Sequence, residues 1–152
     1  MRLALATLLA VLGATAASGA LNQEDLESYS DPSAVIAAIN ANFETKPGQM
    51  VRVTVYENEE DFLEVAAMKH QGVMDESGVA LIRLLGLEPG DYSFAAYLDE
   101  NGDKKLNRGP LGTPAEPLAF SNGIRPRLRR PRFSETKVDV APGSVVLITL
   151  ED

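Results

Sequence analysis

The sequence predicts an all-β protein, namely one antiparallel β-sandwich of about seven strands with one long proline-rich loop. Two observations lead to this prediction. Short stretches of alternating apolar and polar residues are separated by turn signals, as in sandwich domains. The segment 99–131 contains five prolines, which disfavour both helix and central strand, so we expect a long loop there.

The N-terminus has the pattern of an export signal. Arg2 precedes a short apolar run at 3–12, and small residues of a cleavage site follow. We expect cleavage after Ala20, with Ala16 and Gly19 as alternatives, and an N-terminal core helix is the competing interpretation. The expected location is therefore the periplasm or the cell exterior.

The predicted domain organisation has three parts. They are a signal peptide at 1–20, a flexible N-terminal arm at 21–33 and a single β-sandwich domain at 34–152. Removal of the signal would leave 132 of the 152 residues, which suits one domain.

The predicted strands begin in the first half of the domain. Alternation at 35–43 favours a strand, although Asp31 could cap a helix there with Pro32 in its first turn. The segment 50–56 is the clearest strand, with valines on one face and three larger residues on the other: Arg52, Thr54 and Tyr56.

Further strands are expected along the rest of the chain. The segment 62–69 fits either a strand or a short helix. The segment 79–87 is apolar on both faces and fits a central strand, and 92–98 alternates. The last two predicted strands, 133–140 and 144–150, are expected to form a hairpin around Ala141-Pro142-Gly143.

Composition excludes several kinds of protein. No cysteine is present, so there is no disulfide framework and no thiolate metal site. The formal net charge of −8 argues against nucleic-acid binding. The charge is nevertheless uneven, because residues 104–132 hold eight basic side chains and a single acidic one.

Oxygen-bearing side chains recur at the start of the long loop with the spacing of a calcium-binding loop. The candidate metal ligands are Asp99, Asn101, Asp103, the backbone carbonyl of Lys105, Asn107 and Glu116. Calcium is thus the one cofactor that the sequence suggests, with weak affinity because few full carboxylates contribute. The alternative is an ordinary solvated turn, since Asn-Gly pairs and aspartates form turns without metal.

An arginine run closes the loop and is a candidate anion-binding site. Its members are Arg125, Arg127, Arg129, Arg130 and Arg132. Guanidinium groups bind phosphate, sulfate and carboxylate in bidentate fashion, so an anionic envelope polymer is a candidate partner. The alternative is that these arginines neutralise the acidic remainder of the same chain.

Signals for catalysis are weak, and we predict that the protein is not an enzyme. There is no nucleophile elbow and no phosphate-binding glycine loop, and the single histidine, His70, is expected on the surface. The alternative is a small hydrolase of envelope polymers that uses Asp99, Asp103 or Glu116.

An ordered set of short motifs from about Val35 to the C-terminus resembles the domain-of-unknown-function family 2141. The motifs are Pro89-Gly90-Asp91-Tyr92, Asp99-Glu100-Asn101-Gly102-Asp103, Leu106-Asn107, Gly112-x-Pro114-x-Glu116, Phe120-Ser121-Asn122 and Pro131-x-Phe133. The resemblance implies an exported bacterial protein with a prealbumin-like or immunoglobulin-like sandwich, and it implies no established role. The chain departs from the pattern at three places: Lys104 replaces glycine, Asn107 replaces aspartate, and 127–130 replaces a glycine-rich step.

Taken together, these features predict an exported, non-catalytic binding or structural module of the cell envelope. Calcium is a candidate stabilising ion. The candidate partners are an anionic polymer or another envelope protein, and we expect no nucleic acid and no membrane span after signal removal. The alternatives are the hydrolase and a polyanion-binding module that uses the arginine run.

Overall fold

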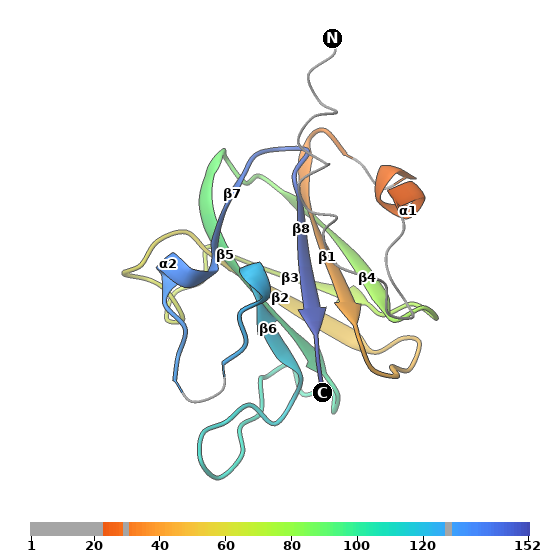
Figure 1. Cartoon of the computed structure of the whole chain (residues 1–152), viewed down its shortest axis with the longest axis vertical. Coiled ribbons are helices and arrows are strands. Elements are labelled where there is room, and N and C mark those ends of the chain that lie inside the picture. Colours follow the sequence, from red (N-terminus) through yellow and green to blue (C-terminus); the bar gives the residue numbers. More distant parts are fainter. Residues whose placement is uncertain (1–22, 29–30, 127–128) are drawn as a thin grey trace.

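The computed structural model describes residues 23–28, 31–126 and 129–152. Two β-sheets pack face to face, which confirms the predicted all-β sandwich (Figure 1). The predicted signal peptide lies outside the described residues. Within the part of the chain that the structure describes, no helix is long and apolar enough to cross a membrane.

The smaller sheet has three strands in the order β4-β1-β8. Their bounds are β1 Ala34–Ala41, β4 Val79–Leu85 and β8 Val145–Leu150. The alternation seen in the sequence fixes the inward face of each strand, since successive side chains point to opposite faces. Thus the odd-numbered residues of β1 from Val35 to Ala41 face the core.

The larger sheet has five strands, of which four follow the order β3-β2-β5-β6. Their bounds are β2 Met50–Tyr56, β3 Met68–Val73, β5 Gly90–Asp99 and β6 Leu118–Phe120. The fifth strand, β7 Lys137–Val140, pairs with the first half of β5, whereas β6 pairs with its second half. The long β5 therefore holds this edge of the sheet together.

The core lies between the two sheets and is almost entirely aliphatic. Val51, Val53 and Val55 of β2 are fully buried there, as are Phe94 of β5 and Ile148 of β8. Removing such side chains from water is the main favourable term in folding, at about 25 cal/mol per Å² of apolar area. The opposite face of β2 is free to carry polar groups.

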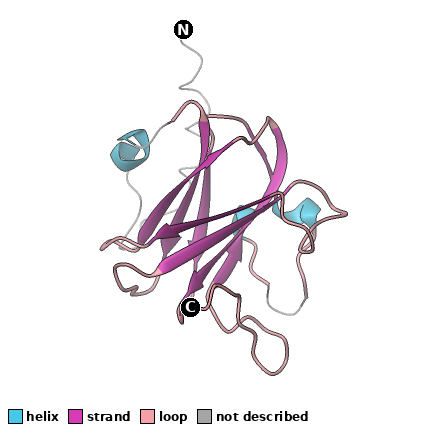
Figure 2. Cartoon of the chain, turned by 180° about the vertical axis from the view of Figure 1, so that it is seen from behind, coloured by secondary structure: helices cyan, strands magenta, loops and turns pink. Residues whose placement is uncertain are grey.

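Two predicted details of topology are corrected by the structure. β7 and β8 do not form a hairpin, because they belong to different sheets and the chain crosses between the layers at 141–144 (Figure 1; Figure 2 shows the two layers from behind). β8 then runs parallel to β1, with Ile36 beside Val145, whereas the remaining strand pairs are antiparallel. Alternation identifies the faces of a strand but not its partner, so the sequence left these pairings unspecified.

Several local predictions also change. The predicted arm contains a short helix, α1 Gln23–Ser28. The segment 62–69 is mostly a turn, and the strand β3 begins only at Met68. The segment 133–140 starts as the helical turn α2 Phe133–Thr136 before β7. The long loop is interrupted by β6 and by the 3-10 turn η2 Ser121–Gly123.

Candidate binding groove

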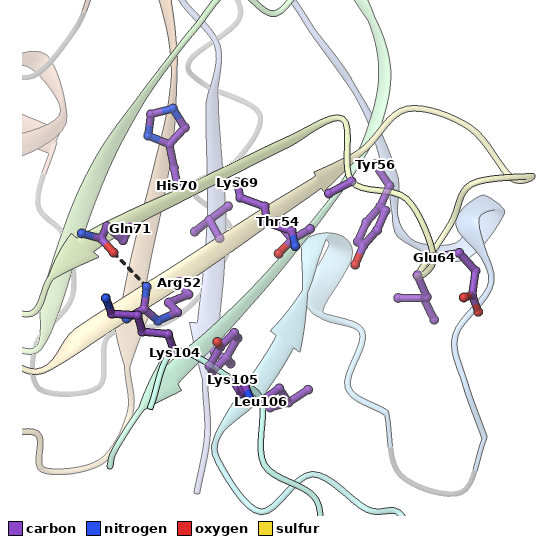
Figure 3. Close-up of a pocket in the computed structure, with 14 residues that line it drawn as sticks. Arg52, Thr54, Tyr56, Glu64, Lys69, His70, Gln71, Lys104, Lys105 and Leu106 are labelled. Atoms are coloured by element: carbon purple, nitrogen blue, oxygen red, sulfur yellow. Dashed lines mark hydrogen bonds between the residues drawn. The ribbon is translucent and has the colours of Figure 1, made fainter. Parts of the chain in front are cut away.

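The outer face of the larger sheet carries a row of polar and aromatic side chains. Arg52 of β2 pairs in register with Gln71 of β3 on one side and with Tyr97 of β5 on the other. Residues paired in register point to the same face, so these three side chains lie in a line across the sheet. Arg52 Nη1 donates to Gln71 Oε1 at 2.8 Å (Figure 3).

Two adjoining hollows lie over this face, one of about 630 Å³ and one of about 490 Å³. Both volumes fall in the range of small-molecule sites. The hollows adjoin each other, since five residues line both of them: Thr54, Tyr56, Leu63, Tyr97 and Leu106. We call the two hollows together the basic groove.

The charge of the basic groove is opposite to that of the protein. Glu64 is its single acidic lining residue among those that the structure describes. Its cationic lining residues number seven and are Arg52, Lys69, Lys104, Lys105, Arg108, Arg129 and Arg130. A concave surface lined by one sign of charge raises the local concentration of oppositely charged ligands. On a chain of net charge −8, such a surface is a local exception.

Four of these cations have no ion-pair partner in the described part of the chain: Lys69, Lys104, Lys105 and Arg108. Arg108 donates to the carbonyl oxygen of Gly112 at 2.9 Å, which neutralises no charge. These four side chains are exposed and available to an anion.

Arg52 is anchored from below by Asp99, the last residue of β5. Its Nε lies 2.7 Å from Asp99 Oδ2, and the side chain of Asp99 is fully buried. The same carboxylate accepts the backbone N–H groups of Gly102 at 2.9 Å and Lys104 at 3.0 Å. One buried carboxylate therefore orients both the guanidinium in the groove and the turn that carries Lys104.

The loop after β5 is organised by its own hydrogen bonds. Glu116 is 6% exposed, and its two carboxylate oxygens accept the N–H groups of Glu100 and Asn107, each at 3.0 Å. Asp103 accepts the Asn107 side-chain amide and the Lys105 N–H, and these bonds lower the pKa of its carboxyl. In this loop, side-chain carboxylates therefore accept the backbone N–H groups that carbonyl oxygens of a neighbouring strand would accept in a sheet.

The structure brings the predicted metal ligands into this one loop, but their oxygens serve as acceptors for loop N–H groups. Within the described ranges, no three His, Cys, Asp or Glu side chains are grouped so that they could hold a metal ion. Asp99 also serves Arg52, and Asn101 Nδ2 donates to Asn107 Oδ1 at 2.9 Å. Calcium binding by Asp99, Asn101, Asp103, Lys105, Asn107 and Glu116 stays a prediction.

The predicted arginine site is spread over several partners. Arg125 is paired with Glu151. Arg129 binds Glu135 through two contacts, at 2.9 and 2.5 Å, and Arg130 lies 3.5 Å from Glu64. Arg127 lies outside the described residues.

Arg132 has an exposed side chain, and its backbone N–H donates to Glu135 Oε2 at 2.8 Å. Together with the guanidinium of Arg129, this bond lowers the pKa of Glu135 to about 2, the contacts with Arg129 being the larger cause. Part of the arginine run is therefore neutralised within the chain, while Arg129 and Arg130 still line the second hollow.

Aromatic packing holds the turn after β2, which borders the groove. The ring of Phe62 contacts those of Tyr56, Phe120 and Phe133, with centroids 5.3, 6.1 and 5.8 Å apart. These edge-to-face contacts hold the turn after β2 against the sheet. That turn also carries Leu63, which lines both hollows.

Sequence reasoning missed most of the groove. Tyr97 is half-buried and lines both hollows, and burial raises the pKa of its hydroxyl. The polar face of 50–56 can be recognised in the sequence, but a polar face is usual for any strand at a protein surface and so does not indicate a binding site. The sequence alone does not show that β2, β3 and β5 lie side by side with their polar faces on the same side of the sheet.

Two of the solved structures that this chain resembles are distant likenesses. One is a Bacteroides thetaiotaomicron VPI-5482 protein provisionally described as polysaccharide-binding (DUF1812), at 13% identity and a TM-score of 0.43. The alignment covers 77% of this chain and 46% of that chain, so this chain spans less than half of it. The other is the major plantain pollen allergen Pla l 1, at 10% identity and a TM-score of 0.38, covering 78% and 93% of the two chains.

No curated protein matches the chain significantly. A family model, described as an uncharacterized protein conserved in bacteria (DUF2141), matches residues 41–147. This match spans the sandwich from the end of β1 to the middle of β8, including the loop and the basic groove. The chain belongs to this bacterial family, as its motifs indicated.

Proposed function

We propose that the protein is an exported, non-catalytic binding module of the bacterial envelope, and that its basic groove binds a segment of an anionic polymer. The observation that carries this proposal is the charge contrast. Seven cations and one carboxylate line the two adjoining hollows, and four of these cations have no ion-pair partner in the described part of the chain, on a protein of net charge −8. Complementary charge both attracts an anionic ligand and fixes its orientation.

The chemistry of the groove favours a glycan as the polymer. Tyr56 and Tyr97 lie on its floor and provide apolar ring surface together with hydroxyl groups. A sugar ring offers apolar C–H faces and hydroxyls in the same way, while its carboxylate or sulfate groups suit lysine and arginine. Two adjoining hollows fit consecutive units of a chain better than one small molecule.

The carboxylates of the long loop support a binding role more than a hydrolytic one. Asp99 is fully buried against Arg52, and Glu116 accepts two N–H groups. A general acid or base must reach the bond that it cleaves, and a carboxylate held in this way would have to leave its partners first. The hydrolase alternative therefore rests on Asp103 alone, which is exposed.

Export is proposed from the signal pattern at 1–20. Fractionation of the producing cells, followed by N-terminal sequencing of the mature protein, tests it. We expect an envelope or secreted form that begins at Leu21. An intact N-terminus on a cytoplasmic protein would reject export.

Binding is tested with three defined polymers: dextran sulfate, polygalacturonate and neutral dextran. We expect the protein to bind one or both anionic polymers, more weakly as salt is raised, and to leave dextran unbound. The two anionic polymers distinguish a preference for sulfate from one for carboxylate. Failure to bind either of them at low salt would reject the proposed function.

A further inference from the structure

Non-glycine residues in the left-handed backbone region are concentrated at the basic groove. In the ranges that the structure describes, they are Leu63, Lys104 and Asn122, with φ of 66°, 67° and 64°. Leu63 and Lys104 both line the first hollow. This conformation is costly for residues with a Cβ, and strained backbone is often found at functional sites.

The side chain of Asn122 makes hydrogen bonds that explain an asparagine at this position. Asparagine tolerates the left-handed region, and the side chain of Asn122 donates to the carbonyl oxygens of Glu135 at 3.2 Å and Lys137 at 2.9 Å. The ammonium of Lys104 makes no hydrogen bond or ion pair with any described residue. The side chain of Leu63 has no polar atom with which to do so.

The turn at Lys104 requires its backbone but not its side chain. The buried carboxylate of Asp99 accepts the N–H groups of Gly102 and Lys104, which fixes the turn. Glycine would adopt the same conformation at lower cost. The lysine side chain also lies in a hollow that it shares with Arg52 and Lys105, where like charges repel. The side chain of Lys104 therefore has no polar contact within the described fold that would explain a lysine at this position.

Leu63 lies toward the other end of the first hollow. β2 and β5 are antiparallel, with Tyr56 paired to Ser93 and Met50 paired to Asp99. The turn after β2 and the loop after β5 therefore begin at opposite ends of the sheet face. The packing of Phe62 fixes the first of these segments, so Leu63 presents an apolar side chain to the groove.

We propose that Lys104 and Leu63 determine the specificity of the basic groove, Lys104 by binding the charged group of an anionic glycan and Leu63 by contacting an adjacent apolar sugar face. This inference rests on the proposed function. On this proposal, a lysine and a leucine occupy two positions where the backbone favours glycine, because the ligand needs their side chains. Stability and binding should therefore respond in opposite directions at Lys104.

The decisive variant is Lys104→Gly, with Lys104→Ala, Lys104→Arg and Lys46→Ala beside it. Lys46 is exposed, lies outside the groove and is the matched control. We expect Lys104→Gly to melt at the wild-type temperature or a few degrees higher, since left-handed strain is relieved. Its affinity for dextran sulfate, or for polygalacturonate if wild type binds only that polymer, should fall about tenfold, as for the loss of one charge-assisted hydrogen bond.

The companion variants separate charge from strain. Lys104→Ala should lose the same affinity without the gain in melting temperature, and Lys104→Arg should retain binding. Leu63→Gly should weaken binding while leaving its salt dependence unchanged, because no charge is removed. Lys46→Ala should bind as wild type does.

Two kinds of failure can be told apart. If wild type binds neither dextran sulfate nor polygalacturonate, the proposed function fails and this inference falls with it. If wild type binds but Lys104→Gly binds equally well, or melts several degrees lower, the specificity role of Lys104 is overturned while the groove remains a binding site. Unchanged binding by Leu63→Gly would likewise overturn the role proposed for Leu63.

Discussion

Arg52 Nε and Asp99 Oδ2 lie 2.7 Å apart, and this ion pair joins the middle of the groove to the base of the long loop. The two residues are 47 positions apart in the sequence. Arg52 is mostly buried, and the side chain of Asp99 is wholly so. Asp99 also accepts the backbone N–H of Lys104. One carboxylate therefore positions both Arg52 in the groove and the turn that carries Lys104.

Replacing Asp99 with alanine should destabilise the fold strongly. The change leaves a buried guanidinium without its partner and frees two backbone N–H groups, so we expect a loss of about 3 kcal/mol or more. Urea denaturation measures it. The control is Asp91→Ala, which removes an exposed pair with Lys137 and should cost about 1 kcal/mol or less. Equal losses in the two variants would show that the Arg52–Asp99 pair has no special role.

Glu116→Gln should loosen the long loop, although the glutamine side chain has nearly the same size as the glutamate that it replaces. Glutamine retains one acceptor oxygen and places an NH₂ group against an N–H donor, at a cost of about 1–3 kcal/mol. Hydrogen exchange at the amides of Glu100 and Asn107 should become faster, since these are the groups that the carboxylate accepts. Glu100→Gln removes the same charge from an exposed neighbour. Unchanged exchange in Glu116→Gln would contradict the role given to this carboxylate.

Acid should weaken the fold partly through Glu135. Contacts with Arg129, and then the N–H of Arg132, lower the pKa of Glu135 from 4.5 to about 2 in the folded state. A lowered folded pKa stabilises the protein above pH 4.5, and that stabilisation is lost as the pH falls toward 2. Melting temperatures of wild type and Glu135→Gln should therefore converge between these two pH values. A constant difference between them down to pH 2 would refute the assignment.

Calcium binding by the long loop is a separate prediction. An affinity of about 0.1–1 mM would stabilise the protein by about 1–2 kcal/mol at several millimolar calcium. The melting temperature should then rise by a few degrees and return when a chelator is added. Asp103→Asn should reduce the rise, because it removes an exposed carboxylate of the loop. No shift with calcium would leave the loop as a turn held by its own hydrogen bonds.

The faces of the strands and the fold class were accessible from the sequence. Alternation at 50–56 correctly put Val51, Val53 and Val55 on one face of the strand and Arg52 on the other, and the structure shows that the valine face is the core face. The turn signals and the prolines of the long segment indicated a sandwich with an extended loop. The motifs indicated the family, which the match over residues 41–147 confirms.

Strand partners and the groove were not accessible, because both depend on contacts between distant segments. A local pattern cannot reveal that β8 runs parallel to β1 or that the last two strands lie in different sheets. The groove arises only when β2, β3 and β5 align Arg52, Gln71 and Tyr97. The buried position of Asp99 likewise follows from the sheet and not from its loop-like neighbours.

The central claim is that the basic groove binds a polyanion. The most direct test reverses two charges inside the groove and, in a second variant, two charges outside it. Lys69→Glu with Lys105→Glu reverses two unpaired cations of the groove, whereas Lys46→Glu with Lys137→Glu reverses two cations outside it. Titration at fixed salt with dextran sulfate, or with polygalacturonate if wild type binds only that polymer, should show at least a tenfold loss of affinity for the groove pair and a much smaller loss for the control pair. Equal losses would mean that net charge alone governs binding, and they would contradict the claim.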